Sequence, residues 1–524
     1  LTFRGSGGNG LIEVGEITGH SPLRGLIGRE VVLTGAGIAM SGSGVIEQVM
    51  IHGTENGADI VMPGTTARGV TFMAESFGAG TDVTLENTGV SLMRLGSWTG
   101  SSLSADWIST LMSMGDFGAD IITDETDSRG AGVGRAIVRG ELSGKWNVSG
   151  DVGMIVTGSV AAGWEADIGG NLGRVIAQDT IGVGGAVTLT AESVGMVVSR
   201  GAFNGNITAT GTDSRGASIG QMVISGQLAG SMDAAGDVST IVTNSIAAGW
   251  AANIDGDVGR VIAQGDIGVG GAVTLTAESV GMVVSRGAFN GDLIATGTDS
   301  RGASVGRMVV MGPLGGGLDT FGDVGMIVAD SIAPGWDAAV GGTIGNLVIR
   351  SDVGQTGGAA VNLMAQMAGS ISILGDLENA QMRFTSPSLD RSGALSRLMV
   401  TGAVRNTNIR SAGTIGMLRA DSMSGSSVFA GIAAGLAGLP ASAAYFARTA
   451  RIDNVQVRSG LEDSDIAAHG LGVVRIDGVQ TDNSDQPFGL AARTVDRLQY
   501  SAGGNRYTWP DGPNPNDDFR VDVI

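Results

Sequence analysis

Acidic and basic side chains that could do acid–base chemistry recur in one short motif, TDSRGA. The motif begins at Thr126, Thr212 and Thr298, and each copy places an Asp two residues before an Arg, as in Asp213 and Arg215. Some β-helix enzymes cleave polysaccharides with clustered Asp, or with Asp plus Arg or Lys, on one face. A catalytic site is unique, however, whereas this motif occurs three times. We therefore interpret it as a repeated loop with a local Asp–Arg pair, and we predict that the protein is not an enzyme.

Metal and cofactor chemistry has few candidates in this sequence. The chain has no cysteine and three scattered histidines, so no thiolate site, histidine metal cluster or histidine-based triad is expected. The segment DGPNPNDD near the C-terminal end offers the oxygen ligands that Ca²⁺ prefers, although it lacks the EF-hand spacing. We predict no catalytic or cofactor-binding residue and leave calcium open, with Asp511, Asp517 and Asp518 as candidate ligands.

The elements that would position any such residues repeat every 86 residues. The run IGVGGAVTLTAESVGMVVSRGAFNG occurs at Ile181–Gly205 and again, unchanged, at Ile267–Gly291. At the same interval AAGW or APGW places Trp164, Trp250 and Trp336. A rod gains length from copying, whereas a catalytic site gains nothing. The tryptophans are either corner residues that cap a core or exposed contacts for carbohydrate or a partner, and we favour the corner.

Each 86-residue unit divides into four coils. An aliphatic anchor, such as Val133 or Val152, is followed by Gly (once Ser), a variable residue and an aliphatic run, at spacings of 19, 20, 22 and 25 residues. Short β-branched strands with glycine at sharp corners are typical of a β-solenoid. We predict an all-β fold, a β-solenoid or β-helix of roughly two dozen coils of about 19–25 residues. At about 4.8 Å per coil, such a chain would form a rod of about 110 Å.

The regularity of the repeat predicts three parts. Residues 1–125 read as divergent N-terminal coils, 126–350 as the regular solenoid, and 351–524 as variant coils with longer loops and a terminal strand. The uncharged stretch Ser422–Ala447 has membrane-spanning length, but its glycines and Pro440 favour a loop. We therefore predict no membrane span.

One position of the coil carries an unexpected apolar row. Strand side chains alternate, so the third position after the glycine shares the outward face with the polar first position. Yet this position is Val or Ile in eleven consecutive coils. Either β-propensity explains the row, or the row packs against a neighbouring chain or a second layer. Its residues are Ile137, Val156, Ile176, Val198, Val223, Val242, Ile262, Val284, Val309, Val328 and Val348.

Composition limits the partners. The formal charge of −20 disfavours binding to nucleic acid or an anionic membrane, because both carry the same sign. The 42% hydrophobic content argues against disorder despite 91 glycines in 524 residues. The absence of cysteine is compatible with export, and a start at Leu1 without Met suggests a processed extracellular protein.

Several sequence segments resemble those of a known group of proteins. VVLTGAGIAMSGSGVIEQVMIHGTENGADI, GDFGADIIT, GDVGMIV, SSVFAGIAAG, EDSDIAAHGLGVVRIDGVQTDN and FGLAARTVDRLQY look like the large glycine-rich repeat proteins of planctomycetes and related bacteria. The resemblance spans most of the chain and implies a β-solenoid surface or matrix protein. It carries no catalytic residues to transfer.

We therefore expect a structural extracellular or cell-surface protein that self-assembles head-to-tail into a filament, sheath or surface layer. The open ends of a solenoid invite another chain to add a strand, which yields an open fibre. The alternatives are an adhesin stalk or passenger domain that binds glycans or cells through C-terminal loops and, less favoured, a polysaccharide-active enzyme. The expected end-to-end contacts are Leu1, Phe3, Leu11, Phe519, Val521 and Val523.

Overall fold

The chain is built of β-strands joined by turns, with almost no helix. The computed structural model describes residues 1–3, 10–390, 393–480, 483–484, 486–509 and 518–524. They form a parallel β-solenoid of about 22 turns, with one short 3-10 helix, η1, at Ala443–Tyr445. The all-β solenoid and its number of coils, both predicted from the sequence, are confirmed.

The chain forms two compact units, Leu1–Gly259 and Arg260–Ile524. The three-part division by repeat regularity stays a prediction. The strands of the first unit are β1 (Ile12–Gly19), β2 (Leu26–Met40), β3 (Gln48–Thr54), β4 (Ile60–Met62), β5 (Val70–Met73), β6 (Ser76–Phe77), β7 (Val83–Leu85), β8 (Val90–Leu95), β9 (Ser97–Trp98), β10 (Ser102–Ala105), β11 (Ile108–Ser113), β12 (Asp120–Thr123), β13 (Ala131–Leu142), β14 (Lys145–Val148), β15 (Asp151–Ala161), β16 (Glu165–Ile168), β17 (Leu172–Ala177), β18 (Ile181–Val183), β19 (Val187–Ala191), β20 (Val194–Ser199), β21 (Phe203–Ala209), β22 (Ala217–Ala234), β23 (Asp237–Ala247) and β24 (Ala251–Ile254).

Strand β25 (Val258–Ala263) contains the boundary between the units. The strands of the second unit are β26 (Ile267–Val269), β27 (Val273–Ala277), β28 (Val280–Ser285), β29 (Phe289–Ala295), β30 (Ala303–Val310), β31 (Pro313–Thr320), β32 (Asp323–Ala329), β33 (Ser331–Ile332), β34 (Asp337–Ile349), β35 (Val361–Ile373), β36 (Leu377–Glu378), β37 (Ala380–Phe384), β38 (Leu395–Val400), β39 (Ala403–Arg405), β40 (Asn408–Ser411), β41 (Ile415–Ser424), β42 (Ser427–Ala430), β43 (Arg451–Glu462), β44 (Asp465–Val479), β45 (Phe488–Ala502), β46 (Asn505–Trp509) and β47 (Phe519–Val523).

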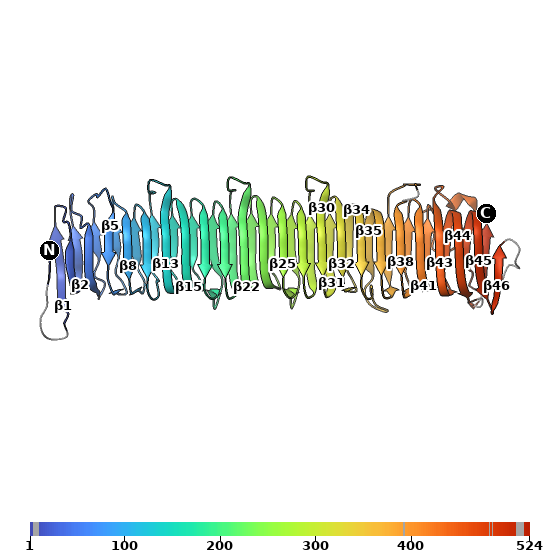
Figure 1. Cartoon of the computed structure of the whole chain (residues 1–524), viewed down its shortest axis with the longest axis horizontal. Helices are drawn as coiled ribbons and strands as arrows, with labels where there is room; N and C mark the ends of the chain where they lie inside the picture. Colours follow the sequence, from blue (N-terminus) through green and yellow to red (C-terminus); the bar gives the residue numbers. More distant parts are fainter. Residues whose placement is uncertain (4–9, 391–392, 481–482, 485, 510–517) are drawn as a thin grey trace. The chain divides into compact units, whose positions relative to one another are not determined.

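Each coil has three strand segments, and each segment pairs with the same segment of the next coil. In the first unit, the first segment of one coil lies in β13, the short second segment follows at Leu142, and the third is β14. The next coil repeats this path in β15 and β16, with parallel pairs such as Ile137 with Val156 and Trp146 with Ala166. Figure 1 shows the strands of successive coils side by side. Alternate side chains point inward and form the core.

The glycine after the anchor marks a close approach between successive coils. A Cβ atom on Gly153 would lie 2.4 Å from the carbonyl oxygen of Gly134, and one on Gly173 would lie 2.3 Å from that of Gly153. Gly195 repeats this at 2.5 Å from the Gly173 oxygen, and none of these glycines has a positive φ. They therefore serve close backbone packing within strands, whereas other glycines, such as Gly163, take the positive φ of the corners. Ser239 takes the equivalent place in one coil.

The three repeated tryptophans are corner residues that face the core. Trp164, Trp250 and Trp336 are 2%, 2% and 1% exposed, which rules them out as surface contacts for carbohydrate. Gly163 and Gly335, directly before two of them, have φ angles of 73° and 80°, which glycine adopts without strain. The interpretation of these tryptophans as corner residues is therefore confirmed.

The divergent N-terminal coils of the first unit use aromatic side chains to fill the interior. Phe72 contacts Phe77 of the same coil edge to face, and Phe77, Trp98 and Phe117 continue this contact through successive coils, with ring centroids 6.5, 5.0 and 5.6 Å apart. All four are buried. Each such contact contributes about 0.5–1.5 kcal/mol beyond the burial of apolar area.

The C-terminal coils of the second unit end in an aromatic cluster. Strand β47 runs parallel to the start of β45, whereas β46 pairs antiparallel with its end. Phe519 is buried and packs against Phe488 and Tyr500, with ring centroids 5.7 and 5.6 Å apart. In the stretch Ser422–Ala447, the described backbone consists of the end of β41, β42, η1 and irregular segments. Within the described ranges, no helix is long and apolar enough to cross a membrane.

A substitution at the glycine ladder tests the close approach. We expect Gly195→Val to lower the free energy of unfolding by at least about 2 kcal/mol, because its side chain would meet a backbone carbonyl. Gly15→Val is the matched control, since a Cβ at Gly15 meets no atom within 4 Å. Thermal unfolding followed by circular dichroism measures both. An equal effect of the two substitutions would contradict the ladder's role.

Candidate interaction surfaces

The predicted apolar row lies on the outward face of the first segment of each coil. Its side chains are half-buried and alternate with buried ones, as Val156 does between Ile155 and Thr157. From Ile137 to Val242 in the first unit, and from Val284 to Val348 in the second, successive members of the row are paired in register from coil to coil. The row residues are Ile137, Val156, Ile176, Val198, Val223 and Val242 in the first unit, and Ile262, Val284, Val309, Val328 and Val348 in the second.

The row is longer than the sequence indicated. After Val348, Ser372 begins a more polar continuation, so the row ends where predicted. Toward the N-terminus it continues through mostly apolar residues, which sequence reasoning missed because these coils lack the regular anchor–glycine pair; Ser109, for example, stands where glycine would be expected. Going toward the N-terminus from Ile137, the residues in register are Met112, Arg94, Met73, Met50 and Ile27.

A cavity of about 460 Å³ in the first unit lies beside this N-terminal part of the row. Met50, Met73 and Arg94 of the row line it, together with His52 and Glu75, whose Nδ1 and carboxylate oxygen lie 3.0 Å apart. The cavity therefore belongs to the row and has one polar contact at its side.

Positive charge shares the face of the row. In the first unit Arg135 and Arg174 are exposed at the outward position next to the row, with Met154 between them in register. Arg139 and Arg200 are exposed just beyond the row in their coils. The six-residue stretches that begin at each anchor, from Val133–Val138 to Val238–Thr243, contain no Asp or Glu. Just beyond them, Arg139 lies beside Asp116, Glu141 and Asp179, so Arg135 and Arg174 are the charges on the face of the row itself.

The third segments of the coils carry the opposite charge. In the first unit Glu165, Asp167 and Asp233 are exposed there, and Lys145 pairs with Glu165 at 2.8 Å. The third segments of the second unit expose three aspartates in the same way. These are Asp292, Asp319 and Asp337.

Many of the remaining acids are structural acceptors at the corners. The Asp151 carboxylate accepts the backbone N–H of Asn171 at 2.7 Å, and Asp323 accepts that of Thr343 at 2.7 Å. In each case the donor belongs to the next coil. The carboxylate accepts a hydrogen bond from a backbone N–H that has no partner in a neighbouring strand. Much of the negative charge therefore holds coils together and does not indicate a cation site.

The TDSRGA loops are closed by the same chemistry. Asp299 Oδ1 accepts the backbone N–H of Arg301 at 2.8 Å and that of Ala303 at 2.9 Å. These hydrogen bonds, the one from Ala303 first, hold the pKa of the Asp299 carboxyl below its usual range. The predicted Asp–Arg pair is thus a contact with the backbone amide of arginine and not with its guanidinium. The repeated loop is confirmed, and its Asp is committed to the backbone.

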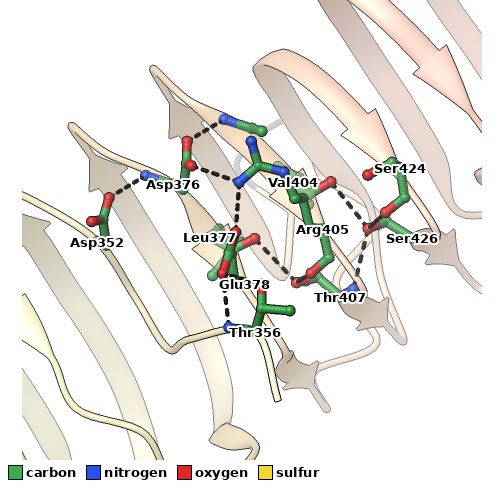
Figure 2. Close-up of polar contacts among 11 residues, drawn as sticks. Asp352, Thr356, Asp376, Leu377, Glu378, Val404, Arg405, Thr407, Ser424 and Ser426 are labelled. Atoms are coloured by element: carbon green, nitrogen blue, oxygen red, sulfur yellow. Dashed lines mark hydrogen bonds and ion pairs between the residues drawn. The ribbon is translucent and has the colours of Figure 1, made fainter. Parts of the chain in front are cut away.

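Two arginines of the second unit each contact two carboxylates. Arg451 contacts Asp453 and Asp496, and Figure 2 shows the cluster around Arg405. Arg405 Nη1 lies 2.6 Å from Asp376 and 2.5 Å from Glu378, and Glu378 accepts the Thr356 hydroxyl at 2.7 Å. That hydroxyl and then the Arg405 guanidinium outweigh burial and hold the pKa of Glu378 below its usual range. Asp352 in turn accepts the N–H of Asp376 at 2.8 Å. The cluster ties three successive coils and is structural.

Of the three predicted calcium ligands, the structure describes only Asp518. Asp511 and Asp517 lie outside the described residues. Asp518 is buried, and its Oδ2 accepts the backbone N–H of Asn483 at 2.6 Å. Within the described residues, no group of three or more His, Cys, Asp or Glu side chains is placed to hold a metal ion.

The predicted end-to-end residues already pair with their own chain on one side. Phe3 N–H donates to the Ile27 carbonyl at 2.9 Å, and Leu11 lies just before β1, which pairs with β2. Leu1 is 61% exposed. In β47, Phe519 is buried, Val521 half-buried and Val523 47% exposed. Their use in end-to-end contacts stays a prediction.

Two described aspartates, Asp106 and Asp465, have carboxyl pKa values raised by burial, and that of Asp106 is raised further by Glu125 and Asp124. Burial raises the pKa of Asp465, at the start of β44, from 3.8 to about 6, although the N–H of Gly489 donates to its Oδ1 at 3.3 Å.

Comparisons with protein-family models, curated proteins and solved structures found no match. The resemblance to glycine-rich repeat proteins of planctomycetes therefore stays a prediction.

Asp465 predicts a pH dependence of stability. Between about pH 4 and 6 the folded chain keeps a proton that the unfolded chain has lost, so the free energy of unfolding falls as pH rises through this window. Asp465→Asn keeps an acceptor for Gly489 without the charge. We expect it to stabilise the protein at pH 7 by roughly 1–3 kcal/mol and to have little effect at pH 3.5.

Urea unfolding at the two pH values measures this effect. Asp376→Asn is the control of opposite sign. Burial pushes the pKa of Asp376 up, but the Ala403 N–H and the Arg405 guanidinium outweigh it and hold the pKa below 3.8. This variant should be less stable than the parent at pH 7. A loss of stability at pH 7 in Asp465→Asn would contradict the account.

Proposed function

We propose that the chain is a structural subunit that acts outside the cell and associates with its own copies into a filament, sheath or surface layer. The observation that carries this proposal is the outward apolar row, which keeps half-exposed Val and Ile side chains in register through consecutive coils of each unit. A strand with one solvated face ordinarily has apolar residues on its inward face and polar residues on its outward face. An exposed apolar row lowers solubility unless a partner covers it.

A second copy of this chain fits the row by charge. Arg135 and Arg174 flank the row, whereas Glu165 and Asp167 are exposed on the third segments. The row face of one copy can therefore lie on the acidic face of another. Both faces repeat at the spacing of parallel strands, about 4.8 Å, so a contact made in one coil recurs in the next.

The available area is sufficient for a specific interface. A first segment of six residues is about 20 Å long, so each coil offers a footprint of about 95 Å². The six row coils of the first unit, from β13 to β23, offer about 570 Å² per partner. The total of about 1,100 Å² exceeds the roughly 1,000 Å² expected of a biological interface.

End-to-end addition is the second part of the proposal. β1 pairs with β2 on one edge, and no described strand pairs with its other edge. Unpaired N–H and C=O groups on such an edge are a template for a strand of another copy. The contact is head-to-tail and therefore yields an open fibre. The corner acids are committed to backbone amides, which supports a structural role and not catalysis.

Charged substitutions in the row test side-by-side association. We expect Val156→Glu with Val223→Glu to weaken self-association at least about tenfold, because each carboxylate would be buried in an apolar contact and would face the acidic third segments of the other copy. Sedimentation velocity over a concentration series measures it. A matched control adds the same charges at exposed loop positions, Ser214→Glu and Ser300→Glu. Equal association of the two double variants would overturn the proposal for the row.

A further inference from the structure

A pocket of the second unit carries an unusual pair of arginines. It has a volume of about 430 Å³, and the segment after β42 forms one wall through Ile432, Ala434 and Gly435. Arg383 of β37 and Arg410 of β40 line the opposite side. They are outward-facing register partners in adjacent coils. Like charges directly opposite each other in a sheet are destabilising.

The pocket supplies no carboxylate to offset these charges. No Asp or Glu is among the residues that line it. Arg383 is exposed, and no described residue makes a hydrogen bond or ion pair with its guanidinium. In the same unit Arg405 receives two carboxylates. The chain thus provides acids for an arginine with a structural role and none for the pair in the pocket.

Arg410 is held in place by neutral groups. Its guanidinium carbon lies 4.9 Å from the centroid of the Phe429 ring, and Nη1 donates to the Ala433 carbonyl at 3.4 Å. Nη2 donates to the Leu436 carbonyl. Burial, and then the charge of Arg383, lower the pKa of Arg410. An anion in the pocket would relieve both unfavourable effects.

Amide side chains stand beside the arginines. Gln381 and Asn408 are outward-facing register partners two residues before Arg383 and Arg410, and both line the pocket. Each amide offers two N–H donors and a carbonyl acceptor, which suits hydroxyl groups of a ligand. The pocket therefore presents two guanidinium groups for an anion next to two amides for hydroxyls.

We propose that this pocket binds an acidic saccharide, with its carboxylate between Arg383 and Arg410 and its hydroxyls against Gln381 and Asn408. Arginine binds carboxylates in a planar, two-pronged arrangement that lysine does not provide. The volume of about 430 Å³ lies within the range of roughly 300–1,000 Å³ typical of small-molecule sites. The site is separate from the apolar row, so it stands whether or not the chain self-associates.

The test uses the full chain and a tetrasaccharide of alternating glucuronate and N-acetylglucosamine. Isothermal titration calorimetry compares it with its carboxyl-reduced counterpart and with inorganic sulfate. We expect the carboxylated probe to bind at least about tenfold more tightly than the reduced one, the loss of one charge-assisted contact. Sulfate alone should bind more weakly than the tetrasaccharide, because it leaves the amides unused. Sulfate binding as tight as the tetrasaccharide, or equal binding of the two saccharides, would overturn the proposal.

Two variants locate the site. Arg383→Gln removes an exposed guanidinium without a partner, and it should lower affinity for the carboxylated probe about tenfold while the circular dichroism spectrum is unchanged. Arg307→Gln, at an exposed outward position of β30, is the matched control and should bind as the parent does. Loss of affinity in both variants, or in neither, would show that the pocket is not the binding site.

Discussion

The hydrogen bonding between successive coils is the constraint on which the rest of the structure depends. Strand segments of successive coils pair in parallel, with the terminal β46 as an antiparallel exception, and the close approach at Gly153 and Gly173 allows the backbones to stay in register. Once the register is fixed, any side chain recurs as a column along the unit. The apolar row, the acidic third segments and the arginine pair are all such columns, so one backbone constraint generates each surface feature.

The same constraint explains the negative charge. Some backbone N–H groups near the corners have no partner in a neighbouring strand. Aspartates such as Asp151 and Asp323 accept hydrogen bonds from such groups of the next coil. The net charge of −20 therefore reflects in part how the coils are joined. What remains for partners is an uneven distribution, with Arg135 and Arg174 beside the row and exposed acids on the third segments. That asymmetry favours a copy of the same chain as the partner.

The fold could be predicted from the sequence because the 86-residue repeat exposes the coil length and the anchor–glycine pattern. The row from Ile137 to Val348 followed from simple alternation along a strand. Its N-terminal continuation through Met112 did not, because coils without the glycine hide the register. The pocket could not be predicted at all. Arg383 and Arg410 are 27 residues apart, a spacing longer than the regular coils, and only the pairing of β37 with β40 brings them together.

Electron microscopy of the purified chain, with and without EDTA, tests the central claim most directly. The account predicts fibres or sheets in which chains lie side by side. These assemblies should persist in EDTA, because apolar and arginine–carboxylate contacts between copies of the chain hold them together. Isolated molecules in both conditions, even at high protein concentration, would contradict self-association.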